Sequence, residues 1–290
     1  MILCGVYALM DIKNTRTRRH TATAAHHHDE DEASVIRASR LSARLIYEVI
    51  RRDGEEELAR PFASLVWSGI AAGILISLSV LGEAVFRLNL SDRPEAFLIE
   101  NIGYSLGFMV VILGRMQLFT ENTITTVLPV VAEWSMSCLA SMMRLWGIVL
   151  TANVVGALCA AAFIALTDAF SADMRAVIFD LSQHATGMGA RESFVRGIPA
   201  GILVAAIVWM MPSASGNAFL IVLAFTWLIA AGDFTHVIAG SVEMGYLLLL
   251  GELGMRAAVF EFFLPVLAGN IVGGTLIFTM LAYGQVKNEV

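Results

Sequence analysis

A polar interruption inside an apolar segment decides the fold: residues 230–244 read Ala-Ala-Gly-Asp-Phe-Thr-His-Val-Ile-Ala-Gly-Ser-Val-Glu-Met. Apolar residues dominate before it, over 218–231, and after it, over 246–250. An ionisable side chain at membrane depth is costly unless it faces a bundle interior or a water-filled cavity. Broken backbone is tolerated there under the same condition. The stretch therefore predicts a discontinuous helix that places His236 at a pore or binding site.

The composition is that of a membrane protein. Of the 290 residues, 57% are hydrophobic and 15% are charged, whereas a soluble domain carries roughly 25% charged residues. The three cysteines have no pairing or metal-ligand spacing, so they indicate neither a disulfide framework nor a metal site. Without a nucleophile elbow or phosphate loop, the sequence predicts no enzyme, no cofactor and no nucleic-acid partner.

The first 58 residues divide into two parts. Residues 1–32 contain His26-His27-His28 and an acidic run, and they are predicted to form a disordered cytoplasmic tail. Within the predicted helical region 33–58, residues 33–52 place apolar side chains near helical spacing with arginines between them. This pattern predicts an amphipathic helix on the membrane surface or against the bundle, which Asp53-Gly54 is expected to end.

Six apolar segments follow within residues 59–285, each near the roughly 20 residues that cross the hydrocarbon core. The uninterrupted ones are expected at about 61–85, 145–166, 194–211 and 260–283. The second segment breaks at residues 114–117, and the fifth breaks at Gly232-Asp233 and His236. Residues 167–192 predict a long external loop, and 286–290 a short cytoplasmic tail.

Two matched strings indicate an internal repeat. Gly69-Ile-Ala-Ala-Gly-Ile-Leu75 and Gly197-Ile-Pro-Ala-Gly-Ile-Leu203 are identical at six of seven positions. Asn153-Val-Val-Gly156 likewise matches Asn270-Ile-Val-Gly273. The two broken segments also correspond. Residues 61–166 and 194–284 are therefore predicted to be the two copies of an internal repeat. Three spans per half require that the repeats be inverted, and paired interruptions point to a central site. Chance similarity between small-residue helices is the alternative.

The two breaks are expected to meet near the membrane midplane. The first contributes Thr120 and Glu121, and the second contributes Asp233, Thr235 and His236. A threonine hydroxyl can donate to or accept from an imidazole, and histidine is the side chain that titrates nearest neutral pH. These residues predict a transport centre, although His236 could instead satisfy buried backbone at the break.

The distribution of basic residues orients the chain. Ten of the 19 Lys and Arg residues precede residue 61. The positive-inside rule then places both termini in the cytoplasm, because six spans return the chain to the same side. The expected location is a bacterial inner membrane.

Four motifs together resemble the formate/nitrite transporter family over residues 35–285. They are Leu118-Phe119-Thr120, Phe234-x-His236, Arg196-Gly197-Ile198 and Gly269-Asn-Ile-Val-Gly-Gly274. The resemblance implies an all-α, aquaporin-like inverted repeat of six transmembrane helices, with the second and fifth broken. It also implies a homopentamer in the lipid bilayer, one pore per protomer, and passage of small monovalent anions or weak acids such as formate or nitrite.

The resemblance assigns further positions in the pore. The central His236 would face Thr120, between one apolar constriction formed by Tyr104, Phe119 and Val204 and another formed by Phe108, Leu118 and Ile229. The sequence departs from the family at Gly201, where a pore-lining Asn is usual, and at Thr235, where a Glu is usual. Asn153 and Asn270 would belong to the matched pore-lining cores.

The departures leave three functions open. The first is a pore for a small anion or its neutral acid, with a proton shared through His236. No lysine lies between Lys13 and Lys287, and acids near a pore repel anions. The second function is a channel for a neutral small solute or water, in which Gly201 widens the path and His236 only lines it. The third is a non-transporting membrane component that binds a partner through the arginine-rich helix.

Overall fold

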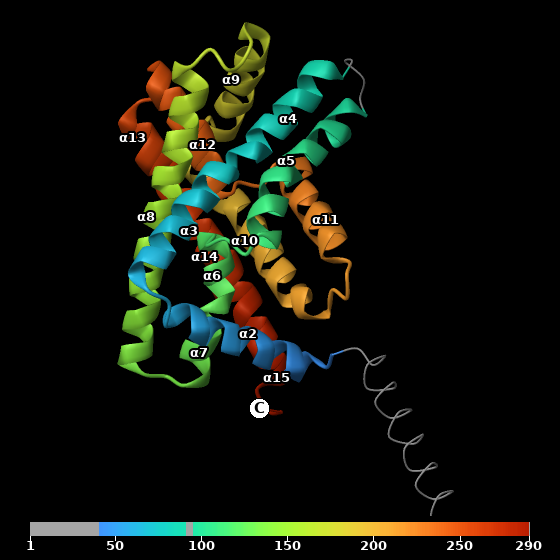
Figure 1. Ribbon diagram of the computed structural model, residues 1–290, viewed down its shortest axis with the longest axis vertical. Helices are drawn as coiled ribbons and strands as arrows, with labels where there is room; N and C mark the ends of the chain where they lie inside the picture. The colour runs from blue at the N-terminus through green and yellow to red at the C-terminus, as the bar shows by residue number, and fades with distance from the viewer. Residues whose placement is uncertain (1–40, 91–94, 290) are drawn as a thin grey trace, which may run out of the picture. The chain divides into compact units, whose positions relative to one another are not determined.

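The computed structural model describes residues 41–90 and 95–289, and every regular element in these ranges is helical (Figure 1). The predicted tail over residues 1–32 and the first part of the amphipathic helix lie outside them. Five helical segments are long and apolar enough to cross a membrane: Phe62–Asn89, Ala96–Leu113, Met136–Leu166, Ala190–Ser213 and Met255–Val286. Two shorter apolar helices, α11 (Ala218–Ala231) and α12 (Val237–Leu250), flank the break that contains His236.

The first half of the bundle contains one interrupted segment. The first span joins α3 (Phe62–Leu75) to α4 (Ser77–Asn89), and the interrupted one comprises α5 (Ala96–Leu113), α6 (Phe119–Thr125) and α7 (Val127–Ala132). The uninterrupted α8 (Met136–Leu166) begins nine residues before the expected start of the third span. Ser135 explains this start, because its side chain accepts a hydrogen bond from the backbone N–H of Cys138 and caps the helix.

The second half contains the other interrupted segment, α11 and α12. It is preceded by α10 (Ala190–Met210) and η1 (Met211–Ser213). The last span runs through α13 (Met255–Ala257), η2 (Ala258–Phe263), α14 (Leu264–Ile271), η3 (Val272–Thr279) and α15 (Met280–Val286). The helices η2 and η3 are π-helical. The last span is therefore helical from Met255 to Val286.

Two expectations about the connecting segments are wrong. Residues 167–192 are not simply a loop, because α9 (Ala172–Thr186) occupies most of them. The amphipathic helix α2 (Ala43–Leu58) does not end at Asp53-Gly54 but continues to Leu58. A side chain at position 54 would collide with the carbonyl oxygen of Thr125. The glycine therefore allows α2 to pack closely beside α6.

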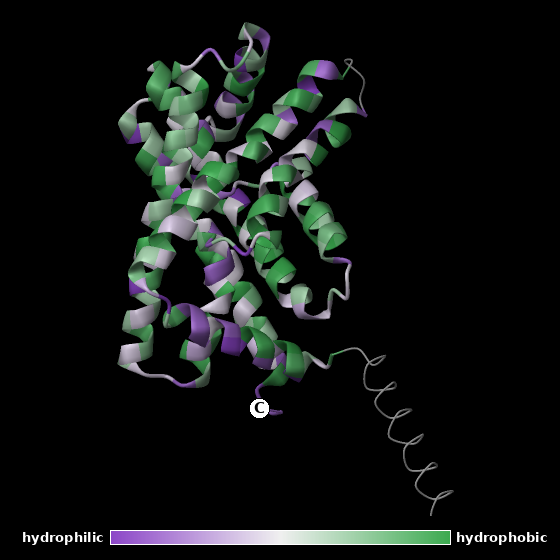
Figure 2. Ribbon diagram, in the orientation of Figure 1, coloured by the Kyte–Doolittle hydropathy of each residue, from purple (hydrophilic) through white to green (hydrophobic). Residues whose placement is uncertain are grey.

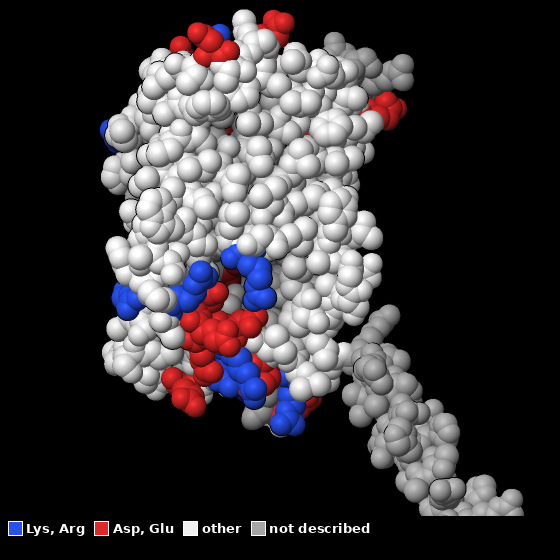
Figure 3. Space-filling view, viewed as in Figure 1, with Lys and Arg blue, Asp and Glu red and all other residues white. Residues whose placement is uncertain are grey.

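Polarity separates the ends of the bundle from its middle. Apolar residues colour most of the long helices, and the most polar stretch of helix is α2 (Figure 2). On the face drawn in Figure 3, charged side chains gather over α2 and at the opposite end, while the band between them shows none. Large apolar side chains remain exposed on the spans, including Trp67, Phe163 and Leu281, as lipid-facing or subunit-facing helices require.

Candidate functional site

The two interruptions have the same backbone geometry. In the first, Gly114, Arg115 and Met116 donate to the carbonyls of Val110, Ile112 and Val111. In the second, Gly232, Asp233 and Phe234 donate to Leu228, Ala230 and Ile229 in the same order. Arg115 and Asp233 both adopt a left-handed conformation, with φ of 53° and 54°. Each turn closes a helix and redirects the chain, so both breaks lead into short extended segments before the next helix begins.

A buried asparagine closes each break from an adjacent helix. Asn153 on α8 accepts from the N–H of Phe119 at 2.9 Å and donates to the carbonyls of Gly69 and Gln117, both at 2.8 Å. Its side chain therefore replaces hydrogen bonds that the broken helix has lost.

Asn270 on α14 makes the corresponding contacts in the other half. It accepts from the N–H of Val237 and donates to the carbonyls of Gly197 and Thr235, all at 2.9 Å. The two asparagines thus act as matched clamps, rather than as side chains in the lining of the cavities described below. These paired contacts support the inverted repeat expected from the two matched strings.

Thr120 and His236 meet where the two breaks converge. The Oγ1 of Thr120 lies 2.8 Å from Nε2 of His236, and both residues are buried. On its other side, the Nδ1 of His236 accepts from the backbone N–H of Ala239 at 3.3 Å and caps α12. The neutral ring then carries its proton on Nε2 and donates it to Thr120, which leaves the threonine hydroxyl proton free for another acceptor.

Apolar side chains surround this polar pair. The ring of Phe108 meets the ring of His236 edge-on, with centroids 4.9 Å apart, and packs on Tyr104 at 5.3 Å. The other residues expected in the constrictions are buried as well: Leu118, Phe119, Val204 and Ile229. Phe119 packs against Trp146 of α8 at 5.4 Å. A buried apolar environment strengthens electrostatic contacts and penalises any ion that must shed its water.

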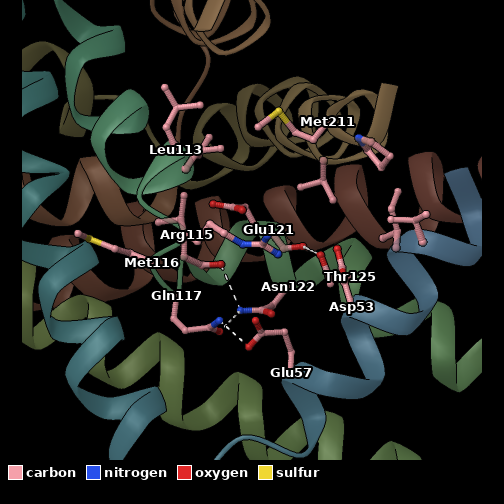
Figure 4. Close-up of a pocket in the computed structure, with 16 residues that line it drawn as sticks. Asp53, Glu57, Leu113, Arg115, Met116, Gln117, Glu121, Asn122, Thr125 and Met211 are labelled. Carbon is pink, nitrogen blue, oxygen red and sulfur yellow. Dashed lines mark hydrogen bonds between the residues drawn. The ribbon is translucent and has the colours of Figure 1, made fainter. Parts of the chain in front are cut away.

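A cavity of about 500 Å³ lies on the side of α2 and is called the α2-side cavity (Figure 4). Leu118, Glu121 and Arg115 line it, together with residues of α2, α5 and α6. In Figure 4, Gln117 connects α2 to the break, because its Nε2 donates to Glu57 at 2.7 Å. Its Oε1 accepts from Asn122 at 3.1 Å.

A smaller cavity of about 70 Å³ lies on the side of α9 and is called the α9-side cavity. His236, Thr235 and Tyr104 line it, and carboxyl groups of α4 and α12 join them. Tyr104 and Leu118 therefore line different cavities, and His236, which contacts Thr120, lines the same cavity as Tyr104.

Asp233 and Thr235 have contacts that the sequence did not indicate. Asp233 does not cap α12, since His236 holds that position. Its carboxylate instead pairs with Arg196 of α10 and contacts Nε2 of His184 on α9 at 2.9 Å. The hydroxyl of Thr235 donates to the carbonyl of Ser193 at 2.9 Å. Both residues therefore fix the second break against α10, and Asp233 also connects it to α9.

The resemblance puts Gly201 at a pore-lining position, and in the structure its α-carbon lies against the backbone of α14. A side chain at this position would collide with the backbone carbonyl of Asn270. Gly73 has the same relation to the backbone of Asn153 in the first half. Both glycines therefore serve close helix packing, and the proposal that Gly201 widens a path for a neutral solute loses its support.

Several polar residues of the cavities were absent from the sequence-based site, among them Glu83, Glu243, His184 and Gln117. Glu83 on α4 and Glu243 on α12 both line the α9-side cavity. An acid within an apolar span is itself a signal of function, so both acids could have been identified from the sequence. No comparable signal marks His184, because its partner Asp233 is 49 residues away. Within the described residues, no group of three or more metal-binding side chains occurs.

The comparisons with known proteins agree with this architecture. The family model described as formate/nitrite transporter matches residues 44–284. The inner membrane protein YfdC of Escherichia coli (strain K12) is 42% identical over 248 residues, which cover 86% of this chain and 80% of YfdC. The formate channel FocA of Haemophilus influenzae is 30% identical over 75% of this chain and 84% of its own length.

Solved structures show the same fold. A pentameric formate channel with formate bound has a TM-score of 0.67 at 21% identity, covering 78% of this chain and 98% of its own. An ion channel of the FNT family has a TM-score of 0.70 at 19% identity, covering 84% and 98%. From the extent of the family match and the identity to full-length relatives, the chain belongs to the formate/nitrite transporter family.

Proposed function

We propose that this protein forms a transmembrane pore for small monovalent anions or their weak acids, such as formate or nitrite. Family membership supports the proposal, as does the relative that is named a formate channel. The five long apolar segments and the two broken helices are what such a pore requires.

The contact between Thr120 and His236 carries the proposal. Because Nε2 of the neutral imidazole donates to Oγ1, the threonine hydroxyl can donate to an oxygen of formate or nitrite. The buried rings and aliphatic side chains around the pair disfavour hydrated ions. A weak acid that crosses with its proton carries no net charge, so this environment favours it over the free anion.

Protonation of His236 is the second, finer part of the proposal. An imidazolium would need a proton on Nδ1, which accepts the N–H of Ala239. Charging the ring therefore costs the cap of α12, so a proton shared through this residue would be coupled to a local rearrangement of the break.

The assembly and the location follow from the relatives. We infer a homopentamer from the fold shared with a pentameric channel. We infer an inner membrane from the name of the 42% identical relative. Exposed apolar side chains such as Phe163 and Leu281 would contact lipid or neighbouring subunits, with both termini in the cytoplasm.

Uptake into proteoliposomes tests the proposal. Labelled formate and nitrite would be offered at about pH 5.5 and pH 7.5, with the internal pH recorded. We expect saturable uptake that acidifies the interior and is faster at the lower pH. Replacing Thr120 with Val removes the hydroxyl at nearly constant volume, and uptake should fall by about tenfold or more, whereas Thr120→Ser should restore it.

His236→Phe is the companion variant. It should abolish uptake while the protein still elutes as the assembled oligomer. Unchanged uptake in both His236→Phe and Thr120→Val would reject the central pair as the transport site. Absence of formate and nitrite uptake in the unaltered protein would reject the substrate class.

A further inference from the structure

Carboxyl groups without protein partners face both cavities. In the α9-side cavity these are Glu83 and Glu243, and in the α2-side cavity Asp53 and Glu121. Within the part of the chain that the structure describes, no hydrogen bond or ion pair involves the side chain of any of the four. We propose that this pore also passes a small protonated weak base, such as methylammonium, as the neutral amine, with these carboxyl groups taking and returning its proton. The inference needs the pore of the proposed function but not its anionic substrate.

The α9-side cavity brings a carboxyl group near the central histidine. His236, Gly240 and Glu243 follow at intervals of four and three residues, so they lie on one face of α12, and all three line the cavity. Glu83 enters the same cavity from α4. Because Gly240 has no side chain, the ring of Phe262 packs against α12 at the turn between His236 and Glu243. Glu243 therefore lies two helical turns from His236 along one wall.

Among the described residues, the other ionisable groups around this cavity form no ion pair with those acids. Asp233 is already paired with Arg196, which also contacts Glu192 at 2.7 Å, and His184 contacts Asp233 rather than the acids of α4 or α12. Tyr104 of α5 adds a neutral hydroxyl. Arg87, one helical turn beyond Glu83 on α4, partly offsets that acid without forming an ion pair. Glu243 thus remains without a cationic partner at this mouth of the pore.

The α2-side cavity supplies a carboxyl group adjacent to the central threonine. Glu121 follows Thr120 directly on α6, and its Oε1 is buried without a hydrogen-bond partner. Figure 4 shows its side chain among the residues around the cavity. An unpartnered buried oxygen is costly, so a group that donates a hydrogen bond to it from the cavity would be favoured.

The charges of this cavity also sum to an acidic lining. Glu57 contacts Arg60 at 3.0 Å and accepts from Gln117, whereas Asp53 has no partner of this kind in the described structure. Arg115 is the cation among the lining residues. Because Arg60 pairs with Glu57, Asp53 and Glu121 stand against Arg115 alone. Two acids against one arginine favour cations over anions at the mouth of a pore, and the chain has no lysine between residues 13 and 287 to reverse this.

The proton exchange balances without an added reagent. At the first cavity, an N–H bond of the ammonium breaks and an O–H bond forms on a carboxylate such as Glu243. The free amine then crosses past Thr120, whose hydroxyl can donate to the nitrogen lone pair. In the second cavity, an O–H bond of Glu121 breaks and the N–H bond re-forms. Each carboxyl group then re-equilibrates with water on its own side, so the net movement is one neutral amine.

The carboxyl groups are better placed for this exchange than the histidine. The Nδ1 of His236 is occupied by the N–H of Ala239, and Nε2 by Thr120. The central pair can therefore contact the amine as a neutral hydrogen-bonding site, while proton transfer takes place in the water-accessible cavities on either side.

The sign of the internal pH change separates the two permeants. Proteoliposomes of the full-length protein that contain a pH-sensitive dye would be mixed with methylammonium chloride or, separately, with sodium formate. A neutral amine takes up a proton inside and makes the interior alkaline, whereas formic acid releases one and acidifies it. We expect methylammonium to produce an alkaline change about tenfold faster than in protein-free vesicles.

Matched variants locate the exchange. Glu243→Gln and Glu121→Gln keep the side-chain size and should each slow the alkaline change by about tenfold. Glu252→Gln and Glu133→Gln remove exposed acids that line neither cavity and should leave it unchanged. Each variant must elute from size-exclusion chromatography as the intact oligomer. If either Glu243→Gln or Glu121→Gln fails to assemble, the other one carries the test.

The outcomes are distinct for the two proposals. An acid change with formate but no protein-dependent alkaline change with methylammonium overturns this inference and leaves the proposed function standing. An alkaline change that neither glutamine variant slows overturns the role of the carboxyl groups. No response to either solute overturns both.

Discussion

Arg115 and Asp233 occupy equivalent positions in the two breaks, with the same left-handed backbone and opposite charges. Their surroundings differ. Asp233 is paired with Arg196 and contacts His184, whereas Arg115 has no ion pair among the described residues and faces the α2-side cavity. The same backbone requirement is therefore met by a tethered acid in one half and by an unpaired arginine in the other.

Glycine substitutions at these two positions should have opposite effects. Arg115→Gly relieves a left-handed conformation that costs a side-chain-bearing residue roughly 1 kcal/mol, and it removes no ion pair. Asp233→Gly relieves the same strain but removes one of the two carboxylates that pair with the partly buried Arg196, leaving Glu192 alone. Thermal unfolding in detergent should show Tm unchanged or raised for the first and lowered for the second. Equal shifts would contradict this account.

The two asparagine clamps should be indispensable. Asn153→Ala and Asn270→Ala each remove three hydrogen bonds to backbone groups of the interior, including an N–H and a carbonyl within the break. With roughly 1 to 3 kcal/mol for each unsatisfied group, either variant should lose most of the assembled protein. Asn89→Ala is the control, because that side chain makes one exposed hydrogen bond within its own helix. Normal yield and Tm for either clamp variant would be inconsistent with the paired geometry.

Gly201→Ala tests whether Gly201 serves helix packing or lines the pore. The added methyl group would collide with the carbonyl of Asn270 and push α10 away from α14, and overpacking of this kind costs about 1 to 3 kcal/mol. Gly147→Ala should have little effect, since nothing lies within 4 Å of the new atom. If Gly201→Ala instead folded normally and changed only solute selectivity, Gly201 would face the pore after all.

Burial of Asp53 on α2 predicts that the stability of the protein depends on pH. Burial raises the pKa of Asp53, and Arg115 only partly opposes this. Because the folded pKa exceeds the unfolded one, the stabilising contribution is present at acidic pH and is lost as pH rises through the folded pKa. Asp53→Asn should therefore raise Tm more at pH 7.5 than at pH 4. A larger gain in Tm at pH 4 than at pH 7.5 would contradict burial as the cause of the raised pKa of Asp53.

Glu48 on the same helix behaves in the opposite sense. Hydrogen bonds from Arg51 and Arg52 lower its pKa to about 2. Its contribution is present above the ordinary carboxyl range and is lost only as pH falls toward 2. Uptake measured between pH 5.5 and 7.5 is thus unaffected by its titration.

The sequence identified the features that interrupt a pattern. Gly232, Asp233 and His236 stand out because apolar residues surround them, and the same contrast marked the first break at Gly114. The matched strings around Asn153 and Asn270 also identified the residues that close both breaks. These signals are local in the chain, and they lie where hydrocarbon tolerates few polar groups.

Other features depended on tertiary packing and could not be identified in this way. The direction in which Gly201 faces follows from how α10 lies against α14. The partners of Asp233 are 37 and 49 residues distant. The helix α9 was missed because its polar faces resemble a solvated loop, although Ser171 supplies an N-cap through its contact with the N–H of Met174.

The unequal sizes of the two cavities have a pharmacological consequence. Drug-sized molecules occupy pockets of about 300 to 1,000 Å³, a range that includes the α2-side cavity at about 500 Å³ but not the α9-side cavity at about 70 Å³. An inhibitor applied from the α2 side could approach Leu118, one residue from the first break. The same compound applied from the other face would meet α9 and the tethered Asp233. Blockers of this pore should therefore act from one face of the membrane, and permeability of the inhibitor itself would decide its potency on whole cells.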